Sequence, residues 1–306
     1  MTQEITQNLT QAMIPKWKVW LLAIRPRTLS ISLVPIIIAT VMASSQVQSL
    51  NWPLICLCLF CSLCVQIGTN LVNDASDFKK GADEHRHFGS LRVTQAGLLS
   101  YNAVQMVGCI CFILAGIFGI PLIYAGGWPL FLVLLFSIAC GYFYTAGPFP
   151  LAYLGCSDIF ILIFFGWVSA CSVFYLQTGD VSLMIVIAST QIGCLAIVPH
   201  AINNLRDYAS DALVNKKTLA VRFGKSFVKK EIVFFSIFPF LLGLFWIFNG
   251  NLWIGLLPIV SLPFILLNLK AIWYEEPSQR YNQYLATSAM CQFLFGCLLA
   301  LGILLW

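Results

Sequence analysis

The sequence predicts an all-α membrane protein with nine transmembrane helices in one domain, on three observations. First, 59% of the 306 residues are hydrophobic and only 9% are charged, whereas soluble domains carry about 25% charged residues. Second, apolar segments recur along the chain, each close to the roughly 20 residues that a membrane span needs. Third, if nine of these segments cross the membrane, every lysine and arginine lies on the same side of it.

The elements follow in order from these apolar segments. Residues 1–28 form a polar N-terminus that leads into PKWKVWLLAIRPRTL (15–29), a stretch expected to lie as a helix in the membrane interface. No cleavable signal peptide is expected. Residues 29–306 form the membrane domain, in which the fourth and fifth spans are the least cleanly separated. The nine spans are expected at about 29–46, 53–73, 103–124, 128–146, 157–176, 182–204, 232–249, 253–271 and 286–306.

The basic residues predict the orientation of the spans. Of the 17 lysines and arginines, four precede the first span, four lie between the second and third, seven between the sixth and seventh, and two between the eighth and ninth. With nine spans these regions share one side, which the positive-inside rule assigns to the cytoplasm. A cytoplasmic N-terminus follows. A different number of spans would scatter the charges over both faces.

The second span ends in a polar stripe, which we call the first acidic segment. Asn70, Asn73, Asp74 and Asp77 stand at positions i, i+3, i+4 and i+7 of NLVNDASD, which places them on one helical face. A merely solvated helix end would scatter its polar groups around the helix. Taken alone, such a segment could still be an ordinary solvated end.

The sixth span ends in a similar sequence, NLRDYASD, which we call the second acidic segment. Asn204, Asp207 and Asp211 stand there at i, i+3 and i+7. Both spans are even-numbered, so both arrive at the cytoplasmic face. Facing each other, the two segments would bring together the four carboxylates of Asp74, Asp77, Asp207 and Asp211.

Four carboxylates in one pocket require cations, because like charges repel and burying each of them is costly. Mg²⁺ answers this need, since it is typically held by one or two carboxylates together with phosphate oxygens and water. Neighbouring bases can meet the remaining charge of a polyphosphate, and they are Lys79, Lys80, Arg92, Arg206 and Lys217. The pattern predicts a diphosphate site. A cation-coupled transporter is the alternative of another class. Such a protein needs ionisable groups near the bilayer midplane, where these spans have almost none.

At these residues the chain resembles the UbiA superfamily of intramembrane aromatic prenyltransferases. The family's first motif, NDxxDxxxD, is matched by Asn73, Asp74 and Asp77, while Gly81 stands at the third aspartate and Asp83 follows two residues later. This shifted spacing is typical of the branch that prenylates 1,4-dihydroxy-2-naphthoate in menaquinone synthesis. Gly81 permits left-handed backbone angles that would end the helix and turn Asp83 back toward the pocket. A plain solvated loop residue is the alternative for Asp83.

The second family motif, DxxxD, is matched by Asp207 and Asp211, followed by KKTLAVRFG in the style of the same branch. Further similar stretches are LAIRPRTLSISLVPIIIAT, GSLRVTQAGLLS and YTAGPFPLAYLGCSDIFILIFFGWVS. The resemblance covers about residues 20–225 and thins out over the last three spans. One departure is the absence, in YTAGPFP, of a lysine that several relatives carry shortly after the tyrosine.

The resemblance implies a ring of nine helices around a central cavity, with roles for each group of residues. The Mg²⁺ ligands would be Asp74, Asp77, Asp83, Asp207 and Asp211. Contacts to the diphosphate would come from Lys80, Arg92, Arg206 and Lys217. Asn70, Asn73 and Asn204 would orient ligands and water, although Asn70 or Asn204 could instead bond a neighbouring helix.

Three further residues have two interpretations each. Tyr144 could face the allylic cation that the reaction generates, although packing is the simpler role for any one aromatic side chain. Asp158, at the head of the fifth span, could act as a base or hydroxyl anchor, or it could cap the helix. His200 could line the cavity or be a hydrogen-bonded interior histidine.

The resulting expectation is an inner-membrane enzyme with its active site open to the cytoplasm. It would transfer the prenyl group of a polyprenyl diphosphate to 1,4-dihydroxy-2-naphthoate with decarboxylation, using Mg²⁺ and giving demethylmenaquinol. Another aromatic acceptor, such as 4-hydroxybenzoate, is the alternative within the family. The expected surroundings are the lipid bilayer, with neither nucleic acid nor an obligate protein partner.

Overall fold

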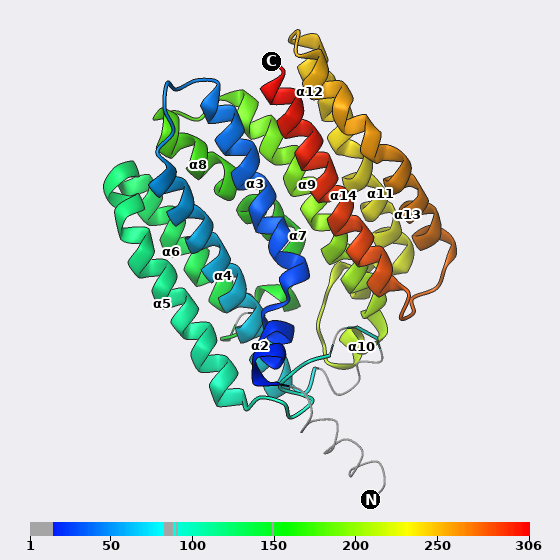
Figure 1. Cartoon of the computed structure of the whole chain (residues 1–306). Coiled ribbons are helices and arrows are strands. Elements are labelled where there is room, and N and C mark those ends of the chain that lie inside the picture. Colours follow the sequence, from blue (N-terminus) through cyan, green and yellow to red (C-terminus); the bar gives the residue numbers. More distant parts are fainter. Residues whose placement is uncertain (1–14, 83–87, 90, 149) are drawn as a thin grey trace, which may run out of the picture.

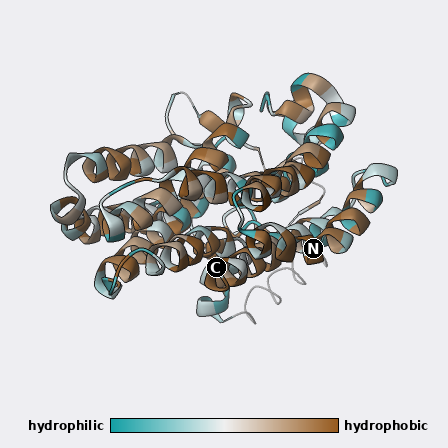
Figure 2. Ribbon diagram, turned by 90° about the horizontal axis from the view of Figure 1, so that it is seen from above, coloured by the Kyte–Doolittle hydropathy of each residue, from teal (hydrophilic) through white to brown (hydrophobic). Residues whose placement is uncertain are grey.

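A computed structural model describes residues 15–82, 88–89, 91–148 and 150–306. Every regular element in these ranges is a helix, and the long helices lie side by side in a bundle (Figure 1). Figure 2 shows the bundle from above, with hydrophobic residues predominating along the helices. The predicted all-α membrane fold is confirmed.

The chain enters the bundle through a bend between α2 (Lys16–Ile24) and α3 (Pro26–Ser44). Arg25 between them has a left-handed φ of 59°, and Pro26 takes the first position of α3, where a missing N–H costs nothing. The helical stretches on either side differ in direction by 58°. α2 therefore lies across the end of the bundle and packs on the helix that carries the first acidic segment (Figure 1).

The first half of the bundle continues with α4 (Trp52–Lys79), α5 (Tyr101–Gly126) and α6 (Trp128–Phe143). α4 and α5 each begin at a polar cap. The Asn51 side chain accepts a hydrogen bond from the Leu54 amide, and Ser100 accepts one from Ala103. Such caps satisfy amides that have no partner inside the helix.

The next span is built from α7 (Ser157–Ile161), η2 (Leu162–Val168) and α8 (Ser169–Thr178), of which η2 is π-helical. It is followed by α9 (Leu183–Arg206) and the short α10 (Tyr208–Leu213). α9 is the central helix of the bundle, since 78% of its apolar window is buried. It packs against α3, α11, α14 and η2.

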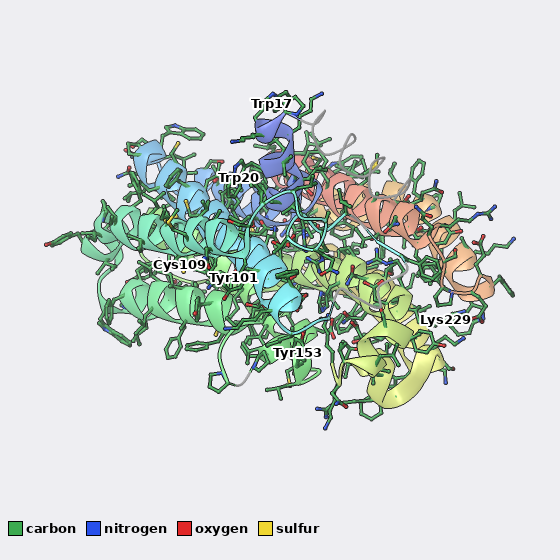
Figure 3. The ribbon with its side chains drawn as sticks, turned by 90° about the horizontal axis from the view of Figure 1, so that it is seen from below. Trp17, Trp20, Tyr101, Cys109, Tyr153 and Lys229 are labelled. Atoms are coloured by element: carbon green, nitrogen blue, oxygen red, sulfur yellow. The ribbon has the colours of Figure 1, made fainter. Side chains whose placement is uncertain are left out.

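The chain closes the bundle with α11 (Leu219–Phe248), α12 (Leu252–Leu256), η3 (Leu257–Ser261), α13 (Leu262–Tyr274) and α14 (Tyr281–Leu304). α11 is interrupted at Gly224, whose backbone is not helical. α4 and α9 end at the same end of the molecule, beside α2 and α10 (Figure 1). Figure 3 looks onto this end, where Tyr101, Tyr153 and Lys229 lie.

Within the described ranges, seven helical spans are long and apolar enough to cross a membrane, and they correspond to all of the predicted spans except the first and the fourth. The bent pair at residues 16–44 would raise the number to eight. α6 has 16 residues, fewer than the roughly 20 of an ordinary span. The chain is thus a multi-pass membrane protein, and the count of nine stays a prediction.

Candidate active site

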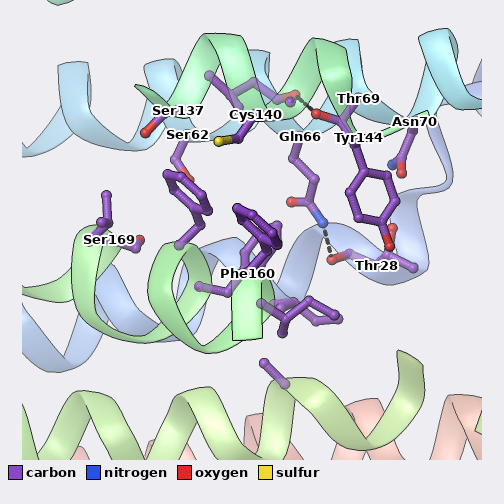
Figure 4. A pocket seen from close by; sticks show the side chains of 18 of the residues that line it. Thr28, Ser62, Gln66, Thr69, Asn70, Ser137, Cys140, Tyr144, Phe160 and Ser169 are labelled. Carbon is purple, nitrogen blue, oxygen red and sulfur yellow. Dashed lines mark hydrogen bonds between the residues drawn. The ribbon is translucent and has the colours of Figure 1, made fainter. Parts of the chain in front are cut away.

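A cavity of about 340 Å³ lies between α3, α4, α6, η2 and α9. Its polar end is lined by Asn70, Asn73, Arg92, Asn203 and Lys216. From there it runs along α4 past Gln66 and Ser62 to Cys58, while Phe160 from α7 faces it from the other side (Figure 4). The end of α4 therefore joins a polar mouth to a largely apolar trough.

The first acidic segment reaches this mouth through Asn73 and Asp77. The Arg92 guanidinium donates to Asn73 Oδ1 at 3.0 Å and lies 3.5 Å from Asp77 Oδ2. The Tyr153 hydroxyl donates to Asp77 Oδ1 at 3.2 Å. Asp77 is buried, so its charge depends on these partners, because an unpaired buried carboxylate is costly.

The Asp74 side chain points toward the segment that follows the first motif. Its two carboxylate oxygens accept hydrogen bonds from the backbone amides of Val93 (3.3 Å) and Thr94 (3.2 Å). It does not line the cavity. Asp74 thus ties the segment after the first motif back onto α4, and its metal ligation stays a prediction.

Of the other predicted residues in this region, Asn70 lines the cavity and Lys80 does not. The Asn70 side-chain amide donates to the Ile24 carbonyl at 3.0 Å, so it also fixes a neighbouring helix. Lys80 Nζ donates to the Thr145 carbonyl at 2.6 Å. Gly81 ends α4 with a φ of 67°, as predicted. Asp83 lies outside the described residues.

The second acidic segment does not follow one continuous helical face, because α9 ends at Arg206 and α10 begins at Tyr208. Asp207 occupies the break and accepts a bidentate pair of hydrogen bonds from Arg206, both at 2.7 Å. Arg206 also donates to Asn203 and Asn282. Its guanidinium is buried and does not line the cavity. In this structure Arg206 binds Asp207, and its contact with phosphate stays a prediction.

Asp211, on α10, lies 3.3 Å from Lys216 Nζ. Burial raises the pKa of the Asp211 carboxyl to about 6, Lys216 lowers it, and the negative charges of Asp207 and Asp77 raise it further. Asp77 and Asp211 are therefore near enough to interact across the mouth. Lys216 lines the cavity, whereas Lys217, the lysine predicted to contact phosphate, is exposed.

Asp77, Asp207 and Asp211 are not themselves cavity-lining residues, but Asp77 and Asp211 are paired with Arg92 and Lys216, which line the mouth. In the described part of the chain, no three potential ligands are grouped closely enough to hold a metal ion. The donors are nevertheless oxygen atoms of the kind Mg²⁺ prefers. Asp211 Oδ2 is buried and has no hydrogen-bond partner among the described residues, so it keeps acceptor capacity for a cation.

Deeper in the cavity, Asn204 and His200 share a hydrogen bond of 3.0 Å between Nδ2 and Nε2. The Tyr144 ring lies 6.5 Å from the His200 ring, and both line the cavity. Asp158 is buried at the start of α7 but neither caps the helix through its side chain nor lines the cavity, whereas its neighbour Ser157 does line it. The role of Asp158 as a base or as an anchor for a hydroxyl stays a prediction.

Two residues at the mouth were not predicted from the sequence. Lys216 stands beside the predicted Lys217, and only the turn after α10 decides which of the two faces inward. Tyr153 lies in LAYLG, between the predicted fourth and fifth spans. This loop has no helical spacing of polar residues that would predict a functional residue. Its position 4.5 Å from Lys80 Nζ, measured to the ring centroid, depends on the fold.

Comparison with known proteins gives one consistent family. The sequence profile of the UbiA prenyltransferase family matches residues 32–302. The chain is 31% identical over 306 residues to the 1,4-dihydroxy-2-naphthoate octaprenyltransferase of Escherichia coli strain K12, covering 97% of this chain and 98% of the relative. It is 30% identical over 302 residues to the Haemophilus influenzae protein of the same name, covering 95% and 97%.

A solved structure shares the fold. A UbiA homolog from Archaeoglobus fulgidus bound to DMAPP and Mg²⁺ superposes with a TM-score of 0.61, at 16% sequence identity, over 93% of this chain and 98% of that one. At this identity the likeness supports the fold alone.

Proposed function

The chain belongs to the UbiA prenyltransferase family, and we propose that it transfers a polyprenyl group from a polyprenyl diphosphate to 1,4-dihydroxy-2-naphthoate. The acceptor would lose its carboxylate, and the product would be demethylmenaquinol. The observation that carries the proposal is a cavity of about 340 Å³ that is apolar in its depth and that both acidic segments line through Asn70, Asn73 and Asn204. The full-length similarity to named naphthoate octaprenyltransferases supports the acceptor.

The chain's own residues have distinct tasks in this reaction. Asp77, Asp207 and Asp211 would hold Mg²⁺, which when bound neutralises charge on the departing diphosphate. Arg92 and Lys216 line the mouth and are placed to contact phosphate oxygens. The donor's prenyl tail would follow the apolar trough beside Phe160 and Phe164. This trough keeps water away from the allylic cation, which water would quench.

An assay with purified protein tests this function. With Mg²⁺ and geranylgeranyl diphosphate, we expect diphosphate release, CO₂ and prenylated naphthol when 1,4-dihydroxy-2-naphthoate is present, and none of these products with EDTA. Matched reactions with 4-hydroxybenzoate and homogentisate identify the acceptor. Faster turnover of 4-hydroxybenzoate would contradict the proposed acceptor. Absence of diphosphate release with every acceptor would contradict the enzyme itself.

We further propose that the protein lies in the cytoplasmic membrane with its cavity mouth toward the cytoplasm. Short tags inserted next to Lys229 and Arg280 should then be reached only from the cytoplasmic side, and a tag next to Asp180 only from outside. Lys229 lies at the same end of the molecule as Tyr153 (Figure 3). Labelling of the Asp180 tag from the cytoplasm would contradict both the orientation and the count of nine spans.

A further inference from the structure

Tyr153 lies in a loop that is held against both halves of the site. It ends the short helix η1 (Leu151–Tyr153), whose Ala152 amide donates to the Tyr144 carbonyl at 2.8 Å. The Tyr153 carbonyl accepts from the Lys217 amide at 3.2 Å. Gly155 follows with a φ of 72°, and a Cβ there would stand 2.8 Å from the Lys217 carbonyl. The loop is therefore packed directly on the segment that follows the second acidic segment.

The Tyr153 side chain contacts residues from both segments. Its hydroxyl donates to Asp77 at 3.2 Å. Its ring has Lys80 Nζ at 4.5 Å and Lys216 Nζ at 5.9 Å from the centroid. Lys80 follows the first acidic segment and Lys216 follows the second. One half-buried side chain thus joins a carboxylate and two ammonium groups from different parts of the chain.

These contacts oppose a repulsion. Two ammonium groups on one ring repel each other, and each is attracted by the negative face of the ring within about 6 Å. Lys216 is also paired with Asp211. Tyr153 is therefore connected to one carboxylate in each acidic segment, to Asp77 directly and to Asp211 through Lys216. Without the ring, Lys80 would keep its bond to the Thr145 carbonyl and Lys216 its pairing with Asp211, but nothing would offset the repulsion between the two ammonium groups.

We propose that Tyr153 is a positioning residue for the diphosphate site. Its hydroxyl orients Asp77 for the cation, and its ring holds Lys80 near Asp77 and Lys216 at the mouth, where Lys216 meets the phosphates of the donor. The inference rests on the proposed function only in taking a prenyl diphosphate as the ligand. It concerns neither the acceptor nor the apolar trough.

Two substitutions separate the hydroxyl from the ring. Tyr153→Phe removes the bond to Asp77 and keeps the ring, whereas Tyr153→Leu removes both. The probe is binding of geranylgeranyl S-thiolodiphosphate, an unreactive donor, titrated with Mg²⁺. We expect Tyr153→Phe to raise the Mg²⁺ concentration for half-maximal binding about tenfold. Tyr153→Leu should in addition raise the Kd of the donor about tenfold. In turnover assays the KM for the acceptor should not change in either variant.

Tyr101 provides the matched control, because its ring carries Lys79 Nζ at 5.9 Å and neither residue lines the cavity, whereas Lys216 beside the Tyr153 ring does line it. Tyr101→Leu should leave both constants within twofold of the wild type. Wild-type Mg²⁺ and donor constants in both Tyr153 variants would overturn the proposal. So would a uniform loss of donor binding, acceptor binding and thermal stability, which would indicate a packing role. If the wild-type protein failed to prenylate the naphthoate, the donor-binding shifts would still test Tyr153.

Discussion

Replacing Asp77 by asparagine is expected to lower kcat for prenyl transfer by about 100- to 1,000-fold. Asparagine keeps the size of the side chain and an oxygen for the Tyr153 hydroxyl, so the main loss is the negative charge. That charge is what a cation at the mouth needs, and in this structure it is met by Arg92 and by the Tyr153 hydroxyl. Turnover with geranylgeranyl diphosphate at saturating Mg²⁺ measures the effect.

The contrasting variant is Asp74→Asn. Asp74 accepts two backbone hydrogen bonds, whereas Asp77 is paired with the cavity-lining Arg92. Asparagine at position 74 can still accept one of the two bonds. We expect a loss of less than about tenfold, the equivalent of one hydrogen bond. Asp180→Asn, in the exposed loop between α8 and α9, is the surface control and should have no effect. If Asp74→Asn were as inactive as Asp77→Asn, Asp74 would be a metal ligand as the sequence first indicated.

Replacing Arg206 by methionine should lower the free energy of unfolding by about 3–5 kcal/mol. The guanidinium is 4% exposed and donates to Asp207, Asn203 and Asn282. Its removal would leave the Asp207 carboxylate buried without its bidentate partner. A thermal melt in detergent should show a decrease in Tm of about 10 °C.

Arg280→Met is the matched control for Arg206. Arg280 is 73% exposed and lies 3.7 Å from Glu275, and exposed ion pairs contribute about 0–1 kcal/mol. Its Tm should therefore stay within about 2 °C of the wild type. If Arg206→Met kept the wild-type Tm and raised only the KM for the donor, Arg206 would contact phosphate as predicted.

The sequence was sufficient to predict that two helices deliver acids to one end of the bundle. Helical spacing placed Asn73 and Asp77 on one face, and the distribution of lysine and arginine placed both helix ends on one side of the membrane. These inferences depend only on local geometry and on the membrane. They require no knowledge of how the helices pack, and the structure places both ends together (Figure 1).

Helical spacing could not separate Asp74 from Asp77, since both lie on the same face of α4. Asp74 is withdrawn from the mouth by amides of Val93 and Thr94, which come from a later segment of the chain. The choice of Lys216 over Lys217 has a similar origin. Asn215, which precedes them, has a left-handed φ of 55°. In such a turn the side chains do not follow the regular spacing of a helix, so the sequence does not predict which of two neighbours points inward. Tertiary contacts and turn geometry thus determine which of two neighbouring candidates faces the cavity mouth.

The π-helical segment η2 explains why one wall of the cavity is straight. The lining residues of this span recur in steps of four, and they are Ser157, Phe160, Ile161, Phe164, Phe165, Val168, Ser169 and Ser172. On an α-helix with 3.6 residues per turn, a four-residue step rotates a stripe by about 40° each time, so Ser172 would have turned away from the trough. A π segment fits more residues into each turn and cancels this rotation. Deleting one residue from 162–168 should therefore leave a stable helix whose far half presents a different set of side chains to the prenyl tail.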